Sequence, residues 1–154
     1  MPWMSSVPGA IDGLVAALRA SPDLEGVTIL DGPTVTSQAI AEMVTVGFED
    51  ESTAAVVESN SAPEGLSRAR DRETYTITCA SQVLLGSSVD APSARRRAYA
   101  LFGAVGGVLA ADSRLGGAVM LAALGTHSLS LPQTPQGVMA QIVFGVDCDA
   151  FSVR

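Results

Sequence analysis

Cys79 and His127 are the residues whose types could form a thiol nucleophile with its base. A histidine beside a cysteine activates it by accepting the thiol proton. Cys79 and Cys148, however, lie in strand-like runs of alternating apolar residues, and no nucleophile-elbow motif surrounds them. We therefore expect both cysteines to be small buried hydrophobes rather than a disulfide or a metal pair. We expect His127 to be a core or interface residue with a satisfied hydrogen bond.

Other residues that could hold a cofactor or a metal ion lack the pattern that such a site needs. The glycines of 103–107 lie inside a predicted helix, whereas a phosphate-binding loop lies between a strand and a helix. Glu49 with Glu51, and Asp147 with Asp149, have no calcium-loop pattern around them, so we expect solvated carboxylates. All nine basic residues are arginine, which leaves no lysine for a Schiff base or a phosphate. The sequence thus predicts no catalytic residue, no cofactor and no metal ion.

Acidic and basic residues are segregated along the chain. Nine acids and no base lie between Asp23 and Glu64, whereas seven arginines lie between Arg68 and Arg114. The net charge of −7 argues against a protein that coats nucleic acid, because such proteins carry basic patches. Two faces of opposite sign suit head-to-tail association into a ring, although the two halves could also mix in space. The candidate interface residues are Glu49, Asp50, Glu51, Arg68, Arg70, Arg72, Arg95, Arg96 and Arg97.

The length and hydropathy of the chain indicate one domain, spanning 1–154. The longest apolar run, Tyr99 to Ala111, has 13 residues, fewer than the roughly 20 that a membrane helix needs. Met1 to Pro8 has neither the basic region nor the apolar stretch of a signal peptide. We therefore expect no membrane span and folding in a cytoplasm.

Hydrophobic periodicity predicts one helix and several strands in the first half of the chain. Apolar residues between Ile11 and Leu18 have the spacing of one helix face. Residues 59–71 have no period, and we expect a long loop that becomes ordered against a neighbouring molecule. The predicted elements of this half are a helix around 11–18, a strand at 27–30, and a hairpin with strands at 43–48 and 53–58 and a solvated tip at 49–52.

The second half shows stronger patterns. A long strand at 72–85 alternates apolar residues with threonines. Asp90 is a suitable N-cap for the helix that follows, whose apolar face runs from Ala98 to Leu109. The predicted elements after this helix are a strand at 118–131 with a kink at Gly125, a turn at 133–137, and a strand at 138–149. Two helices packed on a mostly antiparallel β-sheet, an α+β fold, accommodate this order.

The second predicted helix contains residues that a helix does not favour. Gly103, Gly106 and Gly107 in its interior each cost up to about 1 kcal/mol relative to alanine. Close approach of another backbone would offset this cost, and that backbone belongs either to the domain's own sheet or to a neighbouring subunit. The segment 95–97 places three arginines at the positive end of the helix dipole, which favours either an anionic partner or a solvated face.

Several segments together resemble the tail-terminator proteins of long-tailed bacteriophages. The resemblance covers most of the chain, and none of its pieces is a catalytic signature. Its segments are Glu73-Thr-Tyr-Thr-Ile-Thr-Cys79, Asp90 with Arg95 to Ala98, Asp112-Ser-Arg-Leu-Gly-Gly117, Asp31-Gly32-Pro33, Val46-Gly47-Phe48 and Val138 to Asp149.

The resemblance implies an α+β fold and a structural role in the virion, without enzymatic activity. Tail terminators form rings, usually hexameric, on the head-proximal end of the tail tube, where they stop tube growth. The ring then joins the head-completion protein of the neck, and DNA passes through its centre. The carboxylates of 49–51 would face an interface or this lumen. The alternatives are another neck protein, such as a head-completion or tail-joining protein, or a small cytoplasmic enzyme or ligand-binding domain that uses Cys79 or His127.

Overall fold

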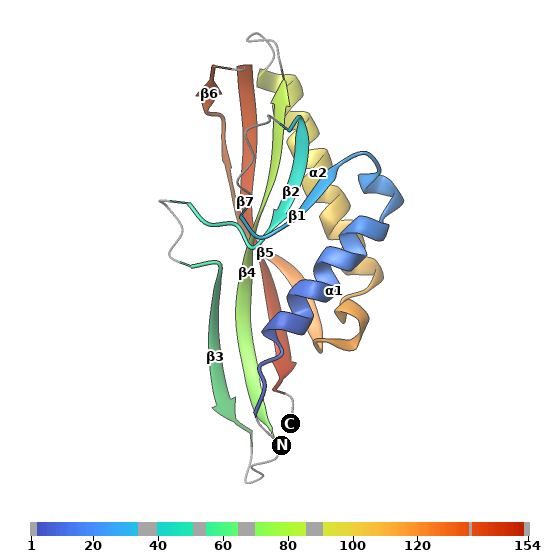
Figure 1. Ribbon diagram of the computed structural model, residues 1–154, viewed down its shortest axis with the longest axis vertical. Helices are drawn as coiled ribbons and strands as arrows, with labels where there is room; N and C mark the ends of the chain where they lie inside the picture. The colour runs from blue at the N-terminus through green and yellow to red at the C-terminus, as the bar shows by residue number, and fades with distance from the viewer. Residues whose placement is uncertain are drawn as a thin grey trace.

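Two helices pack on one face of a seven-stranded, mostly antiparallel sheet (Figure 1). The computed structural model describes residues 3–33, 40–50, 55–64, 70–85, 91–135 and 137–152. The α+β prediction is confirmed. The elements are α1 (Val7–Ala20), η1 (Pro22–Leu24), β1 (Thr28–Asp31), β2 (Glu42–Val46), β3 (Val57–Pro63), β4 (Asp71–Leu85), α2 (Ala91–Ala111), η2 (Leu115–Gly117), β5 (Leu121–Ser130), β6 (Gln133–Thr134) and β7 (Gly137–Phe151).

β4 and β7 form the centre of the sheet and pair antiparallel from Arg72 opposite Phe151 to Leu85 opposite Val138. The other edge of β4 is shared, because β3 pairs with its first half and β2 with its second half. β1 adds to β2 in parallel, while β5 and β6 pair with the far edge of β7. In the lower half of Figure 1 the strand order is therefore β3, β4, β7, β5.

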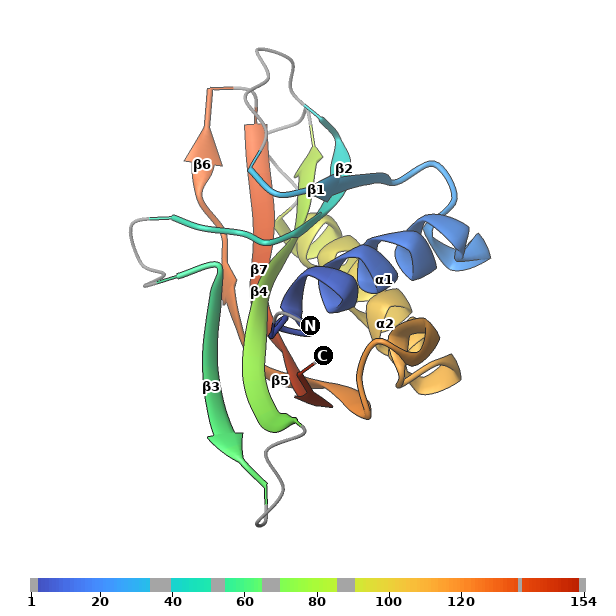
Figure 2. The same cartoon turned by 60° about the horizontal axis from the view of Figure 1, so that its bottom comes forward.

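The core lies between the sheet and the helices, which cover the same face (Figure 2). Tyr75, Ile77, Cys79 and Val83 alternate toward the helices along β4, as their spacing predicts. β7 contributes the residues at even positions from 138 to 150, all of them buried. The helix faces predicted around 11–18 and 98–109 supply the opposite side of this core.

A buried carboxylate on β4 holds the start of α1. Glu73 has 1% of its surface exposed, and its Oε1 accepts a 2.7 Å hydrogen bond from the backbone N of Ser6. Its Oε2 accepts a 2.6 Å hydrogen bond from Oγ of Ser5. A negative charge at a helix N-terminus is stabilised by the helix dipole and by the unpaired N–H groups there. Glu73 therefore ties the first turn of α1 to the sheet.

The glycines of α2 do not share one explanation. A Cβ on Gly106 would lie 3.1 Å from Cδ1 of Leu124 on β5, so the domain's own sheet accounts for this glycine. A Cβ on Gly103 or Gly107 would meet nothing within 4 Å. The own-sheet explanation therefore fails for these two positions, which lie on the exposed side of the helix.

The structure corrects two sequence predictions. β2 and β3 do not form a hairpin, because each pairs with a different half of β4. Gly47, at φ +82°, ends β2, and Phe48 then lines a pocket with Met43 instead of continuing the face of Val46. Residues 59–63, predicted as loop, belong to β3. Their polar side chains show no hydrophobic period because both faces of the strand are exposed, and backbone hydrogen bonds to β4 form the strand.

Other predictions concern positions outside the described residues. These positions are Glu51, Arg68 and Asp90. The proposed break at 86–88 and the part of the predicted loop at 65–69 also lie outside the described ranges.

Candidate assembly interface

No helix covers the sheet face opposite α1 and α2 in the described part of the chain, although Phe48 lines a pocket on it with Met43 and Thr45 of β2. Thr76 and Thr78 of β4 lie on this face beside Gly145 and Asp147 of β7, around a hollow of about 310 Å³. Oγ1 of Thr76 donates a 2.7 Å hydrogen bond to Oδ1 of Asp147. A Cβ on Gly145 would come within 2.6 Å of Cγ2 of Thr76, so the two strands are closely packed here. The uncovered face is polar and rich in hydroxyl groups.

Two strands at opposite margins of the sheet have an open edge. β3 pairs with β4 alone, and β5 pairs with β7 alone, among the strands that the structure describes. Residues 58–63 of β3 are exposed on both faces. The first residues of β5 are covered, since the Ser113 carbonyl accepts a 2.7 Å hydrogen bond from the backbone N of Ala122. The open part of β5 therefore runs from Leu124 to Ser130.

Exposed large hydrophobic side chains gather along β5. Six large hydrophobic residues are exposed in the described ranges, and four of them flank this strand, whereas Trp3 and Met4 lie near the N-terminus. The four beside β5 are Tyr99, Met120, Leu121 and Leu131, with exposed fractions of 38%, 37%, 54% and 38%. Sequence reasoning missed this group, although the break in alternation at Met120-Leu121 was a usable signal.

His127 belongs to an aromatic cluster that joins α2 to β5. Its Nε2 lies 3.2 Å from Oη of Tyr99, and its ring packs on Phe102, which contacts Phe144 of the core. The predicted hydrogen bond is present. The side chain is exposed, however, so the core alternative for His127 is wrong.

Three of the predicted interface arginines have partners within the same chain. Arg72 binds both carboxylate oxygens of Asp149, at 2.9 Å from Nε and 2.5 Å from Nη2. The hydrogen bond from Arg72 lowers the pKa of Asp149, and the same contact raises the pKa of Arg72. Arg97 forms an ion pair with Glu42 of β2, while the guanidinium of Arg70 lies 3.9 Å from the ring centre of Phe151. These contacts leave the three side chains less free to bind a neighbour.

Arg95 and Arg96 are exposed and make no ion pair with any residue that the structure describes. Arg95 precedes Tyr99 by four residues and Phe102 by seven, so all three lie on the side of α2 that faces β5. Arg96 lies on the stripe of Gly103 and therefore points away from the sheet. The three arginine side chains therefore point in different directions: Arg95 toward β5, Arg96 away from the sheet and Arg97 toward β2.

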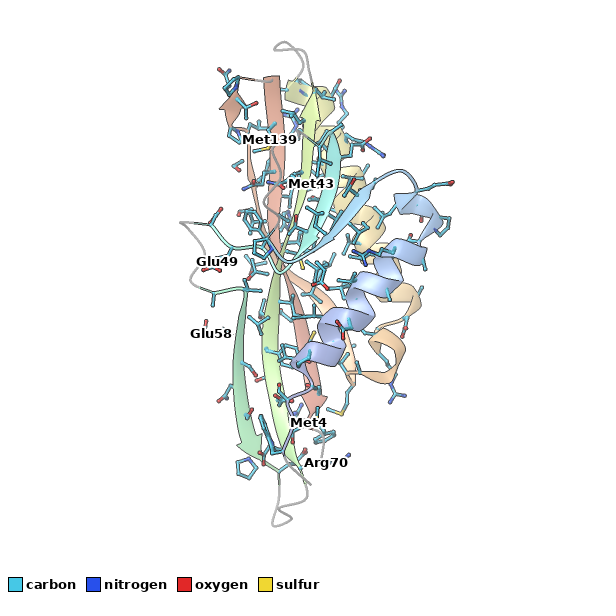
Figure 3. The ribbon with its side chains drawn as sticks, viewed as in Figure 1. Met4, Met43, Glu49, Glu58, Arg70 and Met139 are labelled. Carbon is cyan, nitrogen blue, oxygen red and sulfur yellow. The ribbon has the colours of Figure 1, made fainter. Side chains whose placement is uncertain are left out.

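The predicted acidic residues lie at the opposite margin of the sheet. Glu49 is exposed and Asp50 is half-buried, next to the connection that leads from β2 to β3. Figure 3 shows Glu49 and Glu58 beside the upper end of β3. Glu49 also lines a pocket of about 210 Å³ with apolar side chains that include Leu30 and Phe48. Glu49 and Asp50 therefore lie at the β3 margin of the sheet, whereas the unpaired Arg95 lies on the β5 side.

Cys79 and His127 do not lie close enough to act as a nucleophile and its base. Both residues align with Phe144 of β7, which lies between them in the sheet register. Two strand spacings separate them by roughly 10 Å, too far for direct proton transfer. Burial raises the pKa of Cys79, and likewise that of Cys148, to about 12. Both thiols are free and buried, as predicted.

Within the described ranges no three His, Cys, Asp or Glu residues are grouped so that they could hold a metal ion. No helix in the same ranges has the length and apolar character to span a membrane. Comparison of the sequence with models of known protein families and with curated proteins finds no match.

Proposed function

We propose that this chain is a structural virion protein that forms a ring on the end of a phage tail tube, as a tail terminator. The segments that carry the resemblance fall on the ends of β1 and β2, on β4, on the first turns of α2, on the turn into η2 and on β7. Among them, β4 and β7 form the centre of the sheet, and α2 is one of the two helices on it. The proposal therefore depends on the arrangement of one layered domain and involves no catalytic group.

The uncovered polar face of the sheet is the observation that carries this proposal. A ring that conducts DNA needs an inner wall that does not bind phosphate tightly, because each basic contact adds salt-dependent affinity. Thr76, Thr78 and Asp147 give this face hydroxyl and carboxylate groups. Of the arginines on this face, Arg72 is neutralised by Asp149, and Arg70 lies over the ring of Phe151. A wall of this composition allows DNA to slide.

Termination follows from surface complementarity. One end of the ring matches the last ring of tube subunits, and the other end presents a different surface, to which no further tube subunit adds. The second surface is then available to the head-completion protein of the neck. No covalent step is required, and the ring remains in the virion at the head-proximal end of the tail.

Native mass spectrometry at low micromolar concentration tests the proposal. We expect a closed oligomer, and six copies are usual for the family that the sequence resembles. Adding this oligomer to tube protein from the same genome should stop tube growth, which electron microscopy measures as tube length. A monomer that leaves tube length unchanged would contradict the proposal and favour the enzyme or ligand-binding alternative.

A further inference from the structure

β3 and β5, two of the strands with an open edge, lie at opposite margins of the sheet and carry opposite charges beside them. The β5 margin comprises Leu124–Ser130, with Tyr99, Leu131 and Arg95 beside it. The β3 margin comprises Val57–Pro63, with Glu49 beside it. Glu49 and Glu58 have no ion-pair partner among the described residues, and neither has Arg95. Among the described residues, each margin therefore carries unpaired charge of the sign opposite to that of the other margin.

Strand direction favours pairing between these margins. β3, β4, β7 and β5 are successively antiparallel, so β3 and β5 run in opposite directions at the two margins. A second copy related by rotation about an axis along the strands would place its β3 antiparallel to β5 of the first. The alternation of the sheet would then continue from copy to copy.

The open edges are also offset along the strand direction. Through the sheet register, Leu124 aligns with Val57 at the start of β3, while 127–130 extend beyond it. A sheet that closes on itself needs a stagger in its register, because its strands tilt relative to the axis. The offset between the two edges supplies a stagger of this kind.

We propose that the β5 margin of one copy pairs antiparallel with the β3 margin of the next, so that one sheet continues around the ring. This inference rests on the proposed ring and adds the pairing that closes it. Backbone hydrogen bonds between the two edges would fix the direction of the strands, while Tyr99 and Leu131 would bury apolar surface. Arg95 lies on the helix side of the sheet and Glu58 of the next copy would lie on the other side, so their attraction would act across the sheet edge and orient the contact.

Cysteine crosslinking in the full chain tests this pairing. Ser128 and Ser130 of β5 lie on the uncovered face, as do Glu58 and Asn60 of β3. The double variants S128C/N60C, S130C/E58C, S128C/E58C and S130C/N60C sample the register. The native thiols will not interfere, because Cys79 and Cys148 are buried and burial raises the pKa of each to about 12.

The crosslink pattern reports both partner and direction. In an antiparallel pair, a step forward along one strand is matched by a step back along the other. S128C/N60C and S130C/E58C therefore belong to the same register, and both should form crosslinks. Denaturing gels should then show a ladder that ends at the size of the ring, and each single variant should stay monomeric. A closed ring by mass without β5–β3 crosslinks would overturn this inference and leave the proposed function standing. Dimers from the single S128C variant would overturn it in favour of β5–β5 pairing.

A substitution pair tests the apolar part of the contact. Leu131→Glu should raise the concentration needed for half-assembly by about tenfold, because it would bury a charge in the interface. Met4→Glu is the control, since Met4 is more exposed and follows Trp3, whose Nε1 donates a hydrogen bond to Asp71 at the start of β4. Circular dichroism should show that both variants fold. Equal weakening by both substitutions, or by neither, would overturn the assignment of the β5 margin.

Discussion

Oε1 of Glu73 lies 2.7 Å from the backbone N of Ser6, so a strand residue caps a helix 67 positions earlier in the chain. Glu73→Ala should lower the free energy of unfolding by about 1–3 kcal/mol, because the buried N–H of Ser6 and the half-buried hydroxyl of Ser5 lose their acceptor. Urea denaturation at a fixed protein concentration measures the effect.

Glu58→Ala is the matched control for Glu73, because Glu58 is exposed on the adjacent strand. It should change the free energy of unfolding by less than about 0.5 kcal/mol. Equal effects of the two substitutions would show that the carboxylate of Glu73 does not hold the start of α1.

The contact between Gly145 of β7 and Thr76 of β4 predicts a loss of stability that a second substitution should restore. Gly145→Ala should destabilise the domain by about 1–3 kcal/mol, because the new Cβ would come within 2.6 Å of Cγ2 of Thr76. Thr76→Ser removes this methyl group and keeps the hydroxyl that binds Asp147. The double variant should therefore recover much of the loss in a double-mutant cycle, and strictly additive effects would exclude the contact.

The patterns of the long elements were readable from the sequence because each buries one face. The alternation in 72–85 and in 138–149 predicted β4 and β7 within two residues at each end. β3 was not readable, since a strand exposed on both faces has no hydrophobic period. Its existence depends on backbone pairing with β4, which a single segment does not encode.

The candidate site was predictable in composition but not in geometry. The segregation of acids from arginines was visible, and Glu49 and Arg95 do lie at different margins. The ion pairs of Arg72 and Arg97 were not visible, because their partners are 77 and 55 residues away in sequence. Contacts over such separations follow from the sheet order, which local patterns do not specify.

Substitutions at Gly103 and Gly107, the exposed glycines of α2, distinguish effects on subunit stability from effects on assembly. Gly103→Ala and Gly107→Ala should each stabilise the subunit by about 0.5–1 kcal/mol, because alanine favours the helix and meets no neighbour. Gly106→Ala should give no such gain, since its Cβ would press on Leu124. Thermal denaturation measures stability, and native mass spectrometry shows whether assembly persists. Weaker assembly of the stabilised variants would place a neighbouring subunit on this stripe, whereas unchanged assembly would leave the stripe to solvent.

The Arg72–Asp149 pair gives a pH dependence with a defined sign. Because the folded-state pKa of Asp149 is lowered, the pair contributes stability above the ordinary aspartate pKa of about 3.9 and loses it as pH falls through the folded value. Both side chains are partly exposed, so the contribution is small. Asp149→Asn should therefore reduce stability slightly at pH 6 and have less effect at pH 2–3, as acid titration followed by circular dichroism would show. An effect that grows toward low pH would contradict the assignment.

Two adjacent arginines on α2 provide the sharpest test of the charged part of assembly. Arg95 faces the β5 margin together with Tyr99, whereas Arg96 points away from the sheet. Arg95→Glu should raise the concentration for half-assembly by about 3- to 10-fold, because it replaces attraction to the acids of the next copy with repulsion. Analytical ultracentrifugation at low salt measures this concentration.

Arg96→Glu carries the same change in charge and helix propensity, so it controls for net charge and for the helix dipole. It should assemble like the wild type. Raising the salt concentration should narrow the difference between the Arg95 variant and the wild type, since screening weakens exposed charge pairs over about 8–10 Å. If both variants assemble equally well, Arg95 faces solvent in the ring. If both fail to the same extent, net charge governs assembly, and the direction in which each side chain points from α2 has no influence.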